Sequence, residues 1–423
     1  MLYPTYKITK PIRLIEFFAG YGSQALALKY LGVEFEHWKI CEWAIKSIQA
    51  YKDLHFTNSN IEINMAKEEM VDYLYQKGIS TNYNDPMTKQ QVSRLNEKQL
   101  QTIIKNIKIT NNLVNIQQVK GKDLCITDTD KFTYLLTYSF PCQDLSLAGN
   151  RALMSDTSTR SGMLWEVERI LTELEEKPQI LLMENVPQVH GEGAKEDFNK
   201  WQLRLEELGY KNYWQDLIAT DYGIPQTRNR CFMVSILGDY NYTFPKPIPL
   251  KLKLKDLLED KVDEKYYLSD KQISDIQTWN AYEKPLENME KTDENNISPT
   301  LTTRSGAYAA GMILVKDKCI GTYQYAKSDT FMQGKNRFQL GKDVSDTLQT
   351  TQKEGIVNSN LRIRKLTPKE CFRLMGVKDE DFDKVAKNQS DNSLYHLAGD
   401  SIVCEGVLTS IFKELLWKNI LDY

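Results

Sequence analysis

Apolar and polar positions alternate along the first half of the chain in the pattern of an α/β fold. Short apolar runs suited to buried strands recur at residues 14–18, 36–40, 134–139 and 180–183. Stretches with helical spacing separate these runs, and the alternation extends from Pro11 to about Leu237. Strands joined by helices are typical of a parallel sheet that is covered on both faces. The sequence therefore predicts an α/β, Rossmann-like sheet for this part of the chain.

Three features interrupt or end this alternation. A polar stretch at 61–120, rich in Lys, Gln, Asn and Glu, has helical spacing at 98–108 and predicts a helical insertion. The proline-rich segment 244–249 predicts a domain boundary, because proline does not continue a sheet. Helical spacing returns from about residue 361. A helix expected at 403–416 would present one apolar face, made of Val407, Leu408, Ile411 and Leu415.

A glycine-containing turn follows the first apolar run. Residues 19–23 read Ala-Gly-Tyr-Gly-Ser and precede a helical pattern, so they predict a strand, a tight turn and a helix that can bind a ligand at its N-terminus. No third glycine stands three residues after Gly22 and no P-loop follows, which favours an adenosine-bearing ligand without pyrophosphate. Glu42 stands about 20 residues beyond the glycines, where a carboxylate binds a ribose diol. Trp43 beside it suits either adenine stacking or core packing.

Four later residues are candidates for chemistry. Cys142 follows Pro141 at the end of an apolar run, as either a nucleophile or a buried small hydrophobe. Glu184 ends the run 180–183, and burial there would raise the pKa of its carboxyl group toward that of a useful acid. The alternative is a carboxylate that only caps a strand. Arg228 and Arg230 alternate in a potentially extended segment and would project to one side, as a functional pair or as a solvated edge.

Composition limits the remaining possibilities. The 423 residues are 41% hydrophobic and 26% charged, enough for large cores and two domains. With 54 Lys and Arg against 57 Asp and Glu, the net charge of −3 argues against a broadly basic surface but not against a local basic cleft. Seven irregularly spaced cysteines without Cys-x-x-Cys, and four histidines, indicate a reducing compartment and no metal site. No apolar run approaches a membrane span or a signal-peptide core, so we expect a cytoplasmic protein.

In their order along the chain, these segments resemble the motifs of DNA (cytosine-5) methyltransferases of the bacterial or phage type. The resemblance implies S-adenosyl-L-methionine as the cofactor. It assigns to cofactor binding Phe18, Ala19, Gly20, Gly22, Glu42, Trp43, Asp123, Pro141, Asp400 and Ser401. Asp123 would meet the adenine amino group, although Lys122 splits the usual Gly-Asp pair. Asp400 stands where the family usually has Asn, which keeps a side-chain acceptor and adds a charge.

The resemblance also implies the catalytic roles. Residues 139–143 match the nucleophile loop, 183–186 the acid motif and 226–230 the paired-arginine motif, while 364–376 match the ninth motif. Cys142 would attack C6 of cytosine, because C5 is too weak a nucleophile to take a methyl group unaided. Glu184 would protonate or hydrogen-bond N3. Arg230 would contact O2, and Arg228 would hold phosphate or order the nucleophile loop. The sequence identifies no base for removal of the C5 proton.

The family resemblance extends to domains and partners. It places a smaller, irregular, mainly β target-recognition domain at 245–360, with related segments at 298–303 and 345–351, after a catalytic domain at 1–240. The segment 361–423 would return to the catalytic domain and complete the cofactor pocket. The substrate would be a cytosine flipped out of double-stranded DNA. Candidate basic cleft residues are Arg151, Arg160, Arg304 and the cluster 335–337.

Further partners and other functions are also considered. The insertion at 61–120 would contact DNA flanking the site or form a solvated helical excursion. We expect a monomer, with a restriction endonuclease of the same specificity as a further partner. Two other functions remain: a tRNA cytosine-5 methyltransferase, which the long variable region disfavours, and a catalytically silent DNA-binding module, which the presence of Cys142, Glu184 and Arg230 disfavours. The recognised DNA sequence stays open.

Overall fold

The computed structural model describes residues 3–140, 161–267, 269 and 363–416, and the backbone of four further strands at 312–316, 318–324, 338–340 and 354–357. Several predicted residues and segments lie outside this part of the chain: Pro141, Cys142, Arg151, Arg160, Arg304 and the segments 298–303, 335–337 and 345–351. Among the described helices, none has the length and apolar character needed to cross a membrane.

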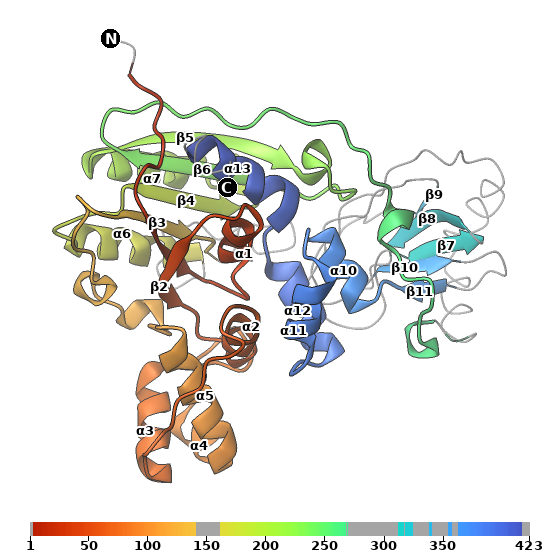
Figure 1. Cartoon of the computed structure of the whole chain (residues 1–423), viewed down its shortest axis with the longest axis horizontal. Coiled ribbons are helices and arrows are strands. Elements are labelled where there is room, and N and C mark those ends of the chain that lie inside the picture. Colours follow the sequence, from red (N-terminus) through yellow and green to blue (C-terminus); the bar gives the residue numbers. More distant parts are fainter. Residues whose placement is uncertain are drawn as a thin grey trace.

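A six-stranded mixed sheet forms the centre of the fold, in the order β2-β1-β3-β4-β6-β5 (Figure 1). Its strands are β1 (Ile12–Phe17), β2 (Phe35–Cys41), β3 (Thr133–Tyr138), β4 (Ile180–Asn185), β5 (Tyr210–Ile218) and β6 (Asn229–Leu237). Strands β1 to β4 are parallel, whereas β6 runs antiparallel to both β4 and β5. All six residues of β3 and of β4 are buried, as expected for central strands covered on both faces.

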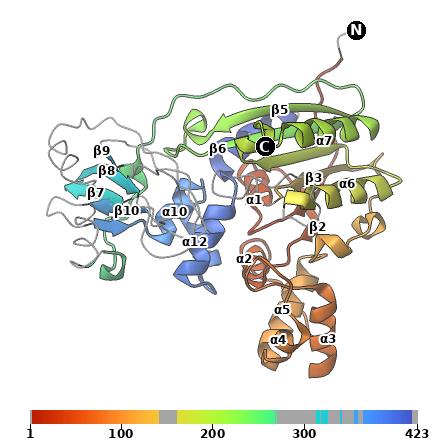
Figure 2. The same ribbon diagram turned by 180° about the vertical axis from the view of Figure 1, so that it is seen from behind.

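Helices pack on both faces of this sheet. One face carries α1 (Ser23–Tyr30) together with C-terminal helices α10 (Pro368–Leu374), α11 (Asp379–Ala386), α12 (Asp391–Asp400) and α13 (Thr409–Leu415), in one shared core. The other face carries α6 (Leu164–Glu173) and α7 (Lys195–Glu207), which Figure 2 shows side by side, with a core around Trp201. The C-terminal segment therefore completes the layer that begins with α1.

The insertion is a small helical unit below the sheet in Figure 1. After α2 (Ile45–His55) it comprises α3 (Lys67–Lys77), α4 (Lys89–Ser93) and α5 (Glu97–Ile109), which enclose an apolar core of their own. Capping boxes at Thr88 and Asn96 fix where α4 and α5 begin. The chain returns to the sheet through a single bridge between Asn112 and Ile40. Three helices therefore lie within the polar stretch 61–120.

A second sheet lies beyond α10, in the order β11-β10-β7-β8-β9. Its strands are β7 (Met312–Lys316), β8 (Lys318–Gln324), β9 (Phe338–Leu340), β10 (Glu354–Val357) and β11 (Ile363–Lys365). A buried ion pair between Arg364 and Glu370, 2.7 Å apart, joins the end of this sheet to α10. Shorter turns lie at 116–118 (η1), 121–124 (η2), 161–163 (η3), 187–190 (η4), 219–222 (η5), 254–257 (η6), 264–266 (η7) and 404–408 (η9).

Candidate active site

The sheet brings the predicted functional residues to one edge. Strands β1 to β4 are parallel, so their carboxyl ends meet there, and β6 begins at the same edge because Asn185 pairs with Cys231. Phe18 to Gly22, Glu42, Glu184 and Arg230 therefore converge, although they are far apart in the chain. Because side chains alternate along a strand, Glu184 and Arg230 both lie on the face of the sheet that packs against the C-terminal helices.

The turn after β1 has an unusual backbone. Phe18, Gly20 and Gly22 all have positive φ angles, of 57°, 55° and 84°. The turn is held by the N–H group of Phe18, which donates to the carbonyl of Cys41 at 2.8 Å. A Cβ added at Gly22 would lie 2.5 Å from His55, whereas nothing lies within 4 Å of one added at Gly20. Gly22 is thus required by close packing, while Gly20 borders open space of the kind a ligand could occupy.

Glu42 ties this turn to the end of β2. Its carboxylate accepts the N–H groups of Gly20 at 2.9 Å and Ala44 at 2.7 Å, and the residue is 8% exposed. Burial raises the pKa of Glu42 to about 7, and the negative charge of Asp400 adds to the rise. Each carboxylate oxygen keeps a lone pair that a ribose hydroxyl could use.

Asn112 also supports Glu42, and sequence analysis missed this residue. Its side-chain amide donates to the Glu42 carbonyl at 2.8 Å, and its side-chain oxygen accepts the N–H group of Glu42 at 3.1 Å and that of Val114 at 2.9 Å. A single Asn in a polar stretch carries no periodic pattern that would mark it. Only the return of the insertion to β2 brings it beside Glu42.

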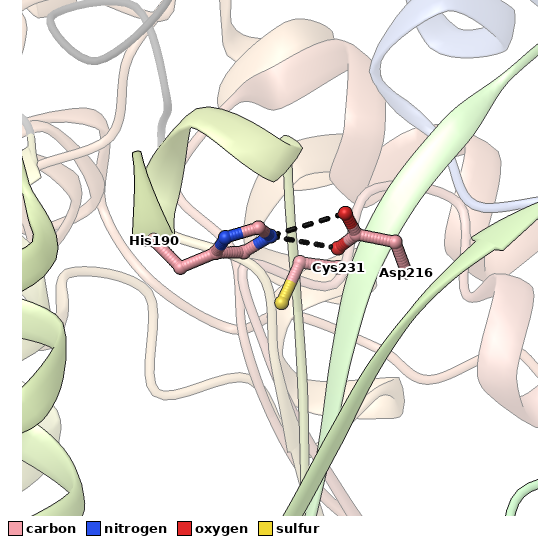
Figure 3. A group of neighbouring side chains, drawn as sticks. All are labelled: His190, Asp216 and Cys231. Atoms are coloured by element: carbon pink, nitrogen blue, oxygen red, sulfur yellow. Dashed lines mark hydrogen bonds and ion pairs between the residues drawn. The ribbon is translucent and has the colours of Figure 1, made fainter. Parts of the chain in front are cut away.

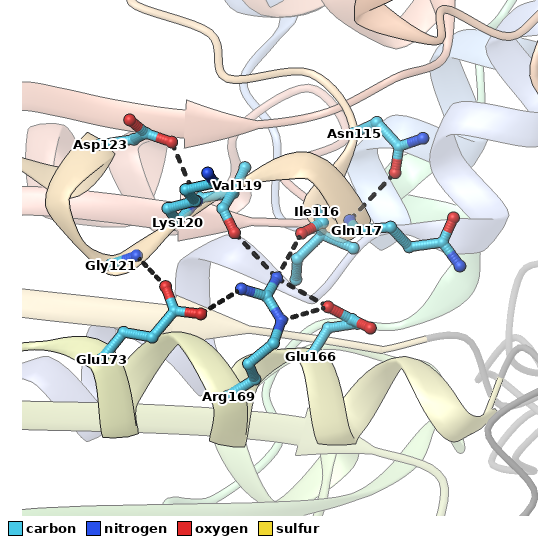
Figure 4. A network of polar contacts seen from close by, with 10 residues as sticks. All are labelled: Asn115, Ile116, Gln117, Val119, Lys120, Gly121, Asp123, Glu166, Arg169 and Glu173. Carbon is cyan, nitrogen blue, oxygen red and sulfur yellow. Dashed lines mark hydrogen bonds and ion pairs between the residues drawn. The ribbon is translucent and has the colours of Figure 1, made fainter.

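Asp123 lies away from this edge. It caps a 3₁₀ turn by accepting the N–H group of Lys120 at 2.9 Å, and the neighbouring Gly121 donates to Glu173 at 2.7 Å (Figure 4). Glu173 is at the C-terminal end of α6, and in Figure 4 Asp123 lies toward that end of the helix, away from Glu166 near its start. The structure therefore does not bring Asp123 to the other predicted cofactor residues. Its capping bond explains why an Asp stands there.

An arginine in α6 organises the polar network of Figure 4. Arg169 pairs with Glu166 at 2.7 Å and Glu173 at 2.8 Å, and it donates to the carbonyls of Ile116 and Val119 at 3.3 and 2.8 Å. These bonds fasten the segment between the insertion and β3 to α6. The network is therefore a support for the fold, and it includes none of the residues at the carboxyl edge.

Glu184 and Arg230 form an ion pair at the junction of β4 and β6. Arg230 Nε lies 3.1 Å from Glu184 Oε1, and Glu184 is 7% exposed. Burial raises the pKa of Glu184, although the guanidinium groups of Arg230 and Arg228 oppose the rise. Next to it, Asn185 donates to the carbonyl of Phe140 at 3.0 Å and so fixes the end of the segment that leads to Pro141.

Arg228 contacts the C-terminal segment. Its guanidinium group donates to the carbonyl oxygens of Gly399 at 3.1 Å and Ser401 at 2.7 Å, and the residue is 4% exposed. These bonds tie Arg228 to the C-terminal segment, and its predicted role of holding phosphate or ordering the nucleophile loop stays a prediction. The hydroxyl group of Tyr21, in the turn after β1, donates to Ser401 Oγ at 3.1 Å, and the negative charge of the exposed Asp400 raises the pKa values of Glu42 and Glu184. Asp400 and Ser401 therefore reach the predicted site.

A cluster on the other face of the sheet has ligand-type side chains. His190 Nε2 lies 2.9 and 3.1 Å from the two oxygens of Asp216, with Cys231 close by (Figure 3). Burial raises the pKa of the Cys231 thiol. The hydrogen bonds between His190 and Asp216 connect the turn after β4 to β5. The cluster is therefore a structural contact that holds the strand ends carrying Glu184 and Arg230.

Comparison with known proteins identifies the family. A model described as C-5 cytosine-specific DNA methylase matches residues 74–417. The chain belongs to this family. It is similar to the type II methyltransferase M2.ScrFI of Lactococcus lactis subsp. cremoris, with 37% identity over 96% of this chain and 99% of the relative. It is also similar to the orphan methyltransferase M.SssI of Spiroplasma monobiae, with 31% identity over 96% of this chain and 98% of that relative.

Solved structures support the fold. The S. pombe Dnmt2 methyltransferase aligns with a TM-score of 0.54 and 15% identity, over 98% of this chain and all of that one. The predicted family, the Rossmann-like α/β fold and the enzyme class, DNA (cytosine-5) methyltransferase, are thus confirmed. Enzymes of this family generally methylate cytosine at C5 with S-adenosylmethionine as methyl donor. The roles of individual residues and the domain limits remain predictions.

Proposed function

We propose that this chain methylates C5 of a cytosine in double-stranded DNA through a covalent bond between Cys142 and C6. The observation that supports this proposal is the buried Glu184–Arg230 pair at the same sheet edge as the Gly20–Glu42 turn. This edge of the sheet thus carries an acid, a cation and a candidate cofactor loop close together. Family membership supplies the reaction type, and this geometry supports the assignment of residues.

The cofactor residues suit S-adenosylmethionine. Glu42 offers a partly neutralised carboxylate for the ribose hydroxyls, and the open space beside Gly20 admits a ligand close to the backbone. Trp43, half-buried next to Glu42, offers a ring for adenine. The bound cofactor supplies a methyl group on a positively charged sulfur. Gly20, Glu42, Trp43, Asp400 and Ser401 would hold it, whereas Asp123 would not.

The catalytic residues then act on the cytosine ring. The Cys142 thiolate forms a bond to C6, the electron pair of the C5–C6 double bond forms a C4–C5 double bond, and the pair of the C4–N3 double bond moves to N3; the resulting enamine makes C5 nucleophilic. Glu184, whose pKa is raised by burial, donates a proton or hydrogen bond to N3 and stabilises the charge there. Arg230 is held beside Glu184 and would bind the neighbouring O2. After methylation, loss of the C5 proton restores the double bond and expels Cys142.

Partners follow from the same chemistry. A cytosine in a duplex cannot reach these groups, so the base would be extruded from double-stranded DNA. We propose that the chain acts as a monomer, since one copy carries every catalytic and cofactor residue assigned here. The relatives include both type II and orphan methyltransferases. A restriction endonuclease of the same specificity is therefore proposed as a partner, testable by protection of methylated DNA from its cleavage.

The decisive experiment uses purified protein, labelled S-adenosylmethionine, mixed-sequence DNA and tRNA. We expect label in DNA only, and 5-methylcytosine within one recurring sequence when mapped at single-base resolution. Cys142→Ala should abolish methyl transfer while DNA binding persists. Cys125→Ala, at an exposed free cysteine, should leave the rate of methyl transfer unchanged. Label in tRNA alone would replace the DNA assignment. Turnover near the wild-type rate in Cys142→Ala would exclude the covalent mechanism.

A further inference from the structure

The insertion and the C-terminal segment meet through two aromatic rings. Tyr83, in the loop between α3 and α4, stacks on His396 of α12. Their ring centroids are 3.8 Å apart and their planes are 14° from parallel. Such close stacking between segments this far apart in the sequence is specific to the folded chain. It connects two parts that the family motifs treat as separate.

The loop that carries Tyr83 is anchored next to Glu42. Ser80 forms a bridge with Ala44, donating to the carbonyl of Trp43 at 2.8 Å and accepting from Ile45 at 2.9 Å. The side chain of Asn82 then accepts two backbone N–H groups within the loop, at 2.9 and 3.0 Å. The position of Tyr83 is therefore set directly by the end of β2, where the cofactor ribose is expected.

Tyr83 adopts a backbone conformation that aromatic residues rarely occupy. Its φ angle is 63°, in the left-handed region that Gly and Asn tolerate and bulky residues avoid. A residue held in such a conformation is typical of ligand clamps and active sites, where the surroundings impose it. The contacts of the ring, among them the stack on His396, therefore offset a conformation that the backbone alone disfavours.

The other side of the stack is anchored next to Asp400. His396 Nδ1 lies 3.1 Å from the carboxylate of Asp400, one turn further along α12. Arg228 fixes the carbonyls on either side of Asp400. Tyr83 itself lies close enough to both Glu42 and Asp400 for their charges to raise its pKa, after the larger effect of burial. The stack thus spans from one predicted cofactor residue to another.

We propose that Tyr83 and His396 form a clasp that closes the cofactor pocket between β2 and α12 and slows cofactor release. This inference rests on the proposed function, because it assumes that S-adenosylmethionine binds at Glu42 and Asp400. It gives the insertion a role in cofactor retention. Both residues are positioning residues, since their rings hold the pocket closed and take no part in bond formation.

The test measures the dissociation rate of labelled S-adenosylmethionine from the full-length protein by chase with unlabelled cofactor. Tyr83→Asn removes the ring, and Asn tolerates the positive φ angle, so the fold should persist. We expect dissociation about three- to tenfold faster, from the ordinary strength of an aromatic pair. DNA affinity should not change, and the thermal midpoint should fall by no more than a few degrees. Tyr83→Phe, which keeps the ring, should release cofactor at the wild-type rate.

Two further variants complete the test. His396→Leu removes the other ring from a helix that Leu suits, and it should accelerate release as Tyr83→Asn does. If Tyr83→Asn does not fold, the rate of cofactor release from His396→Leu tests the clasp instead. Tyr75→Ala, at a 46% exposed tyrosine of α3, is the control and should have no effect. Unchanged release in both ring-removing variants would refute the clasp alone. Wild-type protein that binds no cofactor would refute both the clasp and the proposed cofactor site.

Discussion

Arg230 Nε lies 3.1 Å from Oε1 of Glu184, where the end of β4 adjoins the start of β6. The antiparallel pairing of these strands produces the contact, because it turns two residues that are distant in sequence toward the same face. Burial raises the pKa of Glu184 while Arg230 lowers it. The carboxyl group is thereby held at the edge of the sheet with a cation beside it, as the proposed chemistry at N3 and O2 requires.

Glu184→Gln should reduce the rate of methyl transfer by about 10²–10⁴-fold, because glutamine keeps the shape but has no carboxyl proton to donate. Single-turnover transfer of labelled methyl groups to DNA measures this rate directly. Glu192→Gln, at an exposed residue in the following segment, is the matched control. A rate within a few-fold of wild type in Glu184→Gln would remove Glu184 from the mechanism.

Arg228→Met should lower the free energy of unfolding by about 2–4 kcal/mol, because two carbonyl groups lose their buried donor. Chemical denaturation measures this change. The salt dependence of DNA affinity should stay the same, whereas loss of a phosphate contact would reduce the salt slope by about 1. Arg204→Met, at an exposed arginine of α7, should change stability by less than about 1 kcal/mol.

Gly20 and Gly22 should respond differently to alanine. Gly22→Ala should lower the free energy of unfolding by about 2–4 kcal/mol, because its φ is +84° and the added methyl would lie 2.5 Å from His55. Gly20→Ala should lower the free energy of unfolding by only about 1–2 kcal/mol, because the positive φ angle is the single unfavourable factor there. Its methyl group would instead enter the open space and weaken cofactor binding. Denaturation and calorimetric titration with S-adenosylmethionine test both; equal affinity in Gly20→Ala and wild type would contradict the assignment.

Stability should decrease between about pH 5 and 7 because of Glu16, which is fully buried and has a pKa raised to about 7 by burial. A carboxyl group whose pKa is raised on folding stabilises the protein at low pH, and this contribution is lost as pH rises through the folded pKa. The shift corresponds to about 3 kcal/mol. Glu42, also with a pKa of about 7, contributes with the same sign.

Glu16→Gln should therefore flatten this part of the stability curve. Urea unfolding of both proteins at several pH values between 5 and 8 measures the difference. Burial lowers the pKa of His37 to about 4, so this residue makes stability rise with pH. Because His37 is present in both proteins, its effect cancels when they are compared. Glu36→Gln, at an exposed carboxylate of β2, should leave the slope unchanged. A wild-type slope in Glu16→Gln would show that other groups control the pH dependence.

The sequence by itself determined the family, the enzyme class and the α/β fold. Buried strands appear as short apolar runs, and tight turns are marked by glycine. The motifs that contain Gly20, Glu42, Glu184 and Arg230 follow one another in the order typical of the family. Such features depend on neighbours within a few residues. They can be recognised without knowledge of long-range contacts.

Tertiary structure decided which of these residues meet and what supports them. Asn112 reaches Glu42, Arg228 binds the carbonyls of Gly399 and Ser401, and Tyr83 stacks on His396 only after the chain has folded. Asp123 shows the converse, since its motif suggested a cofactor contact and its place in the fold gives it a capping bond. Partners separated by tens or hundreds of residues leave no local pattern, because packing alone brings them together.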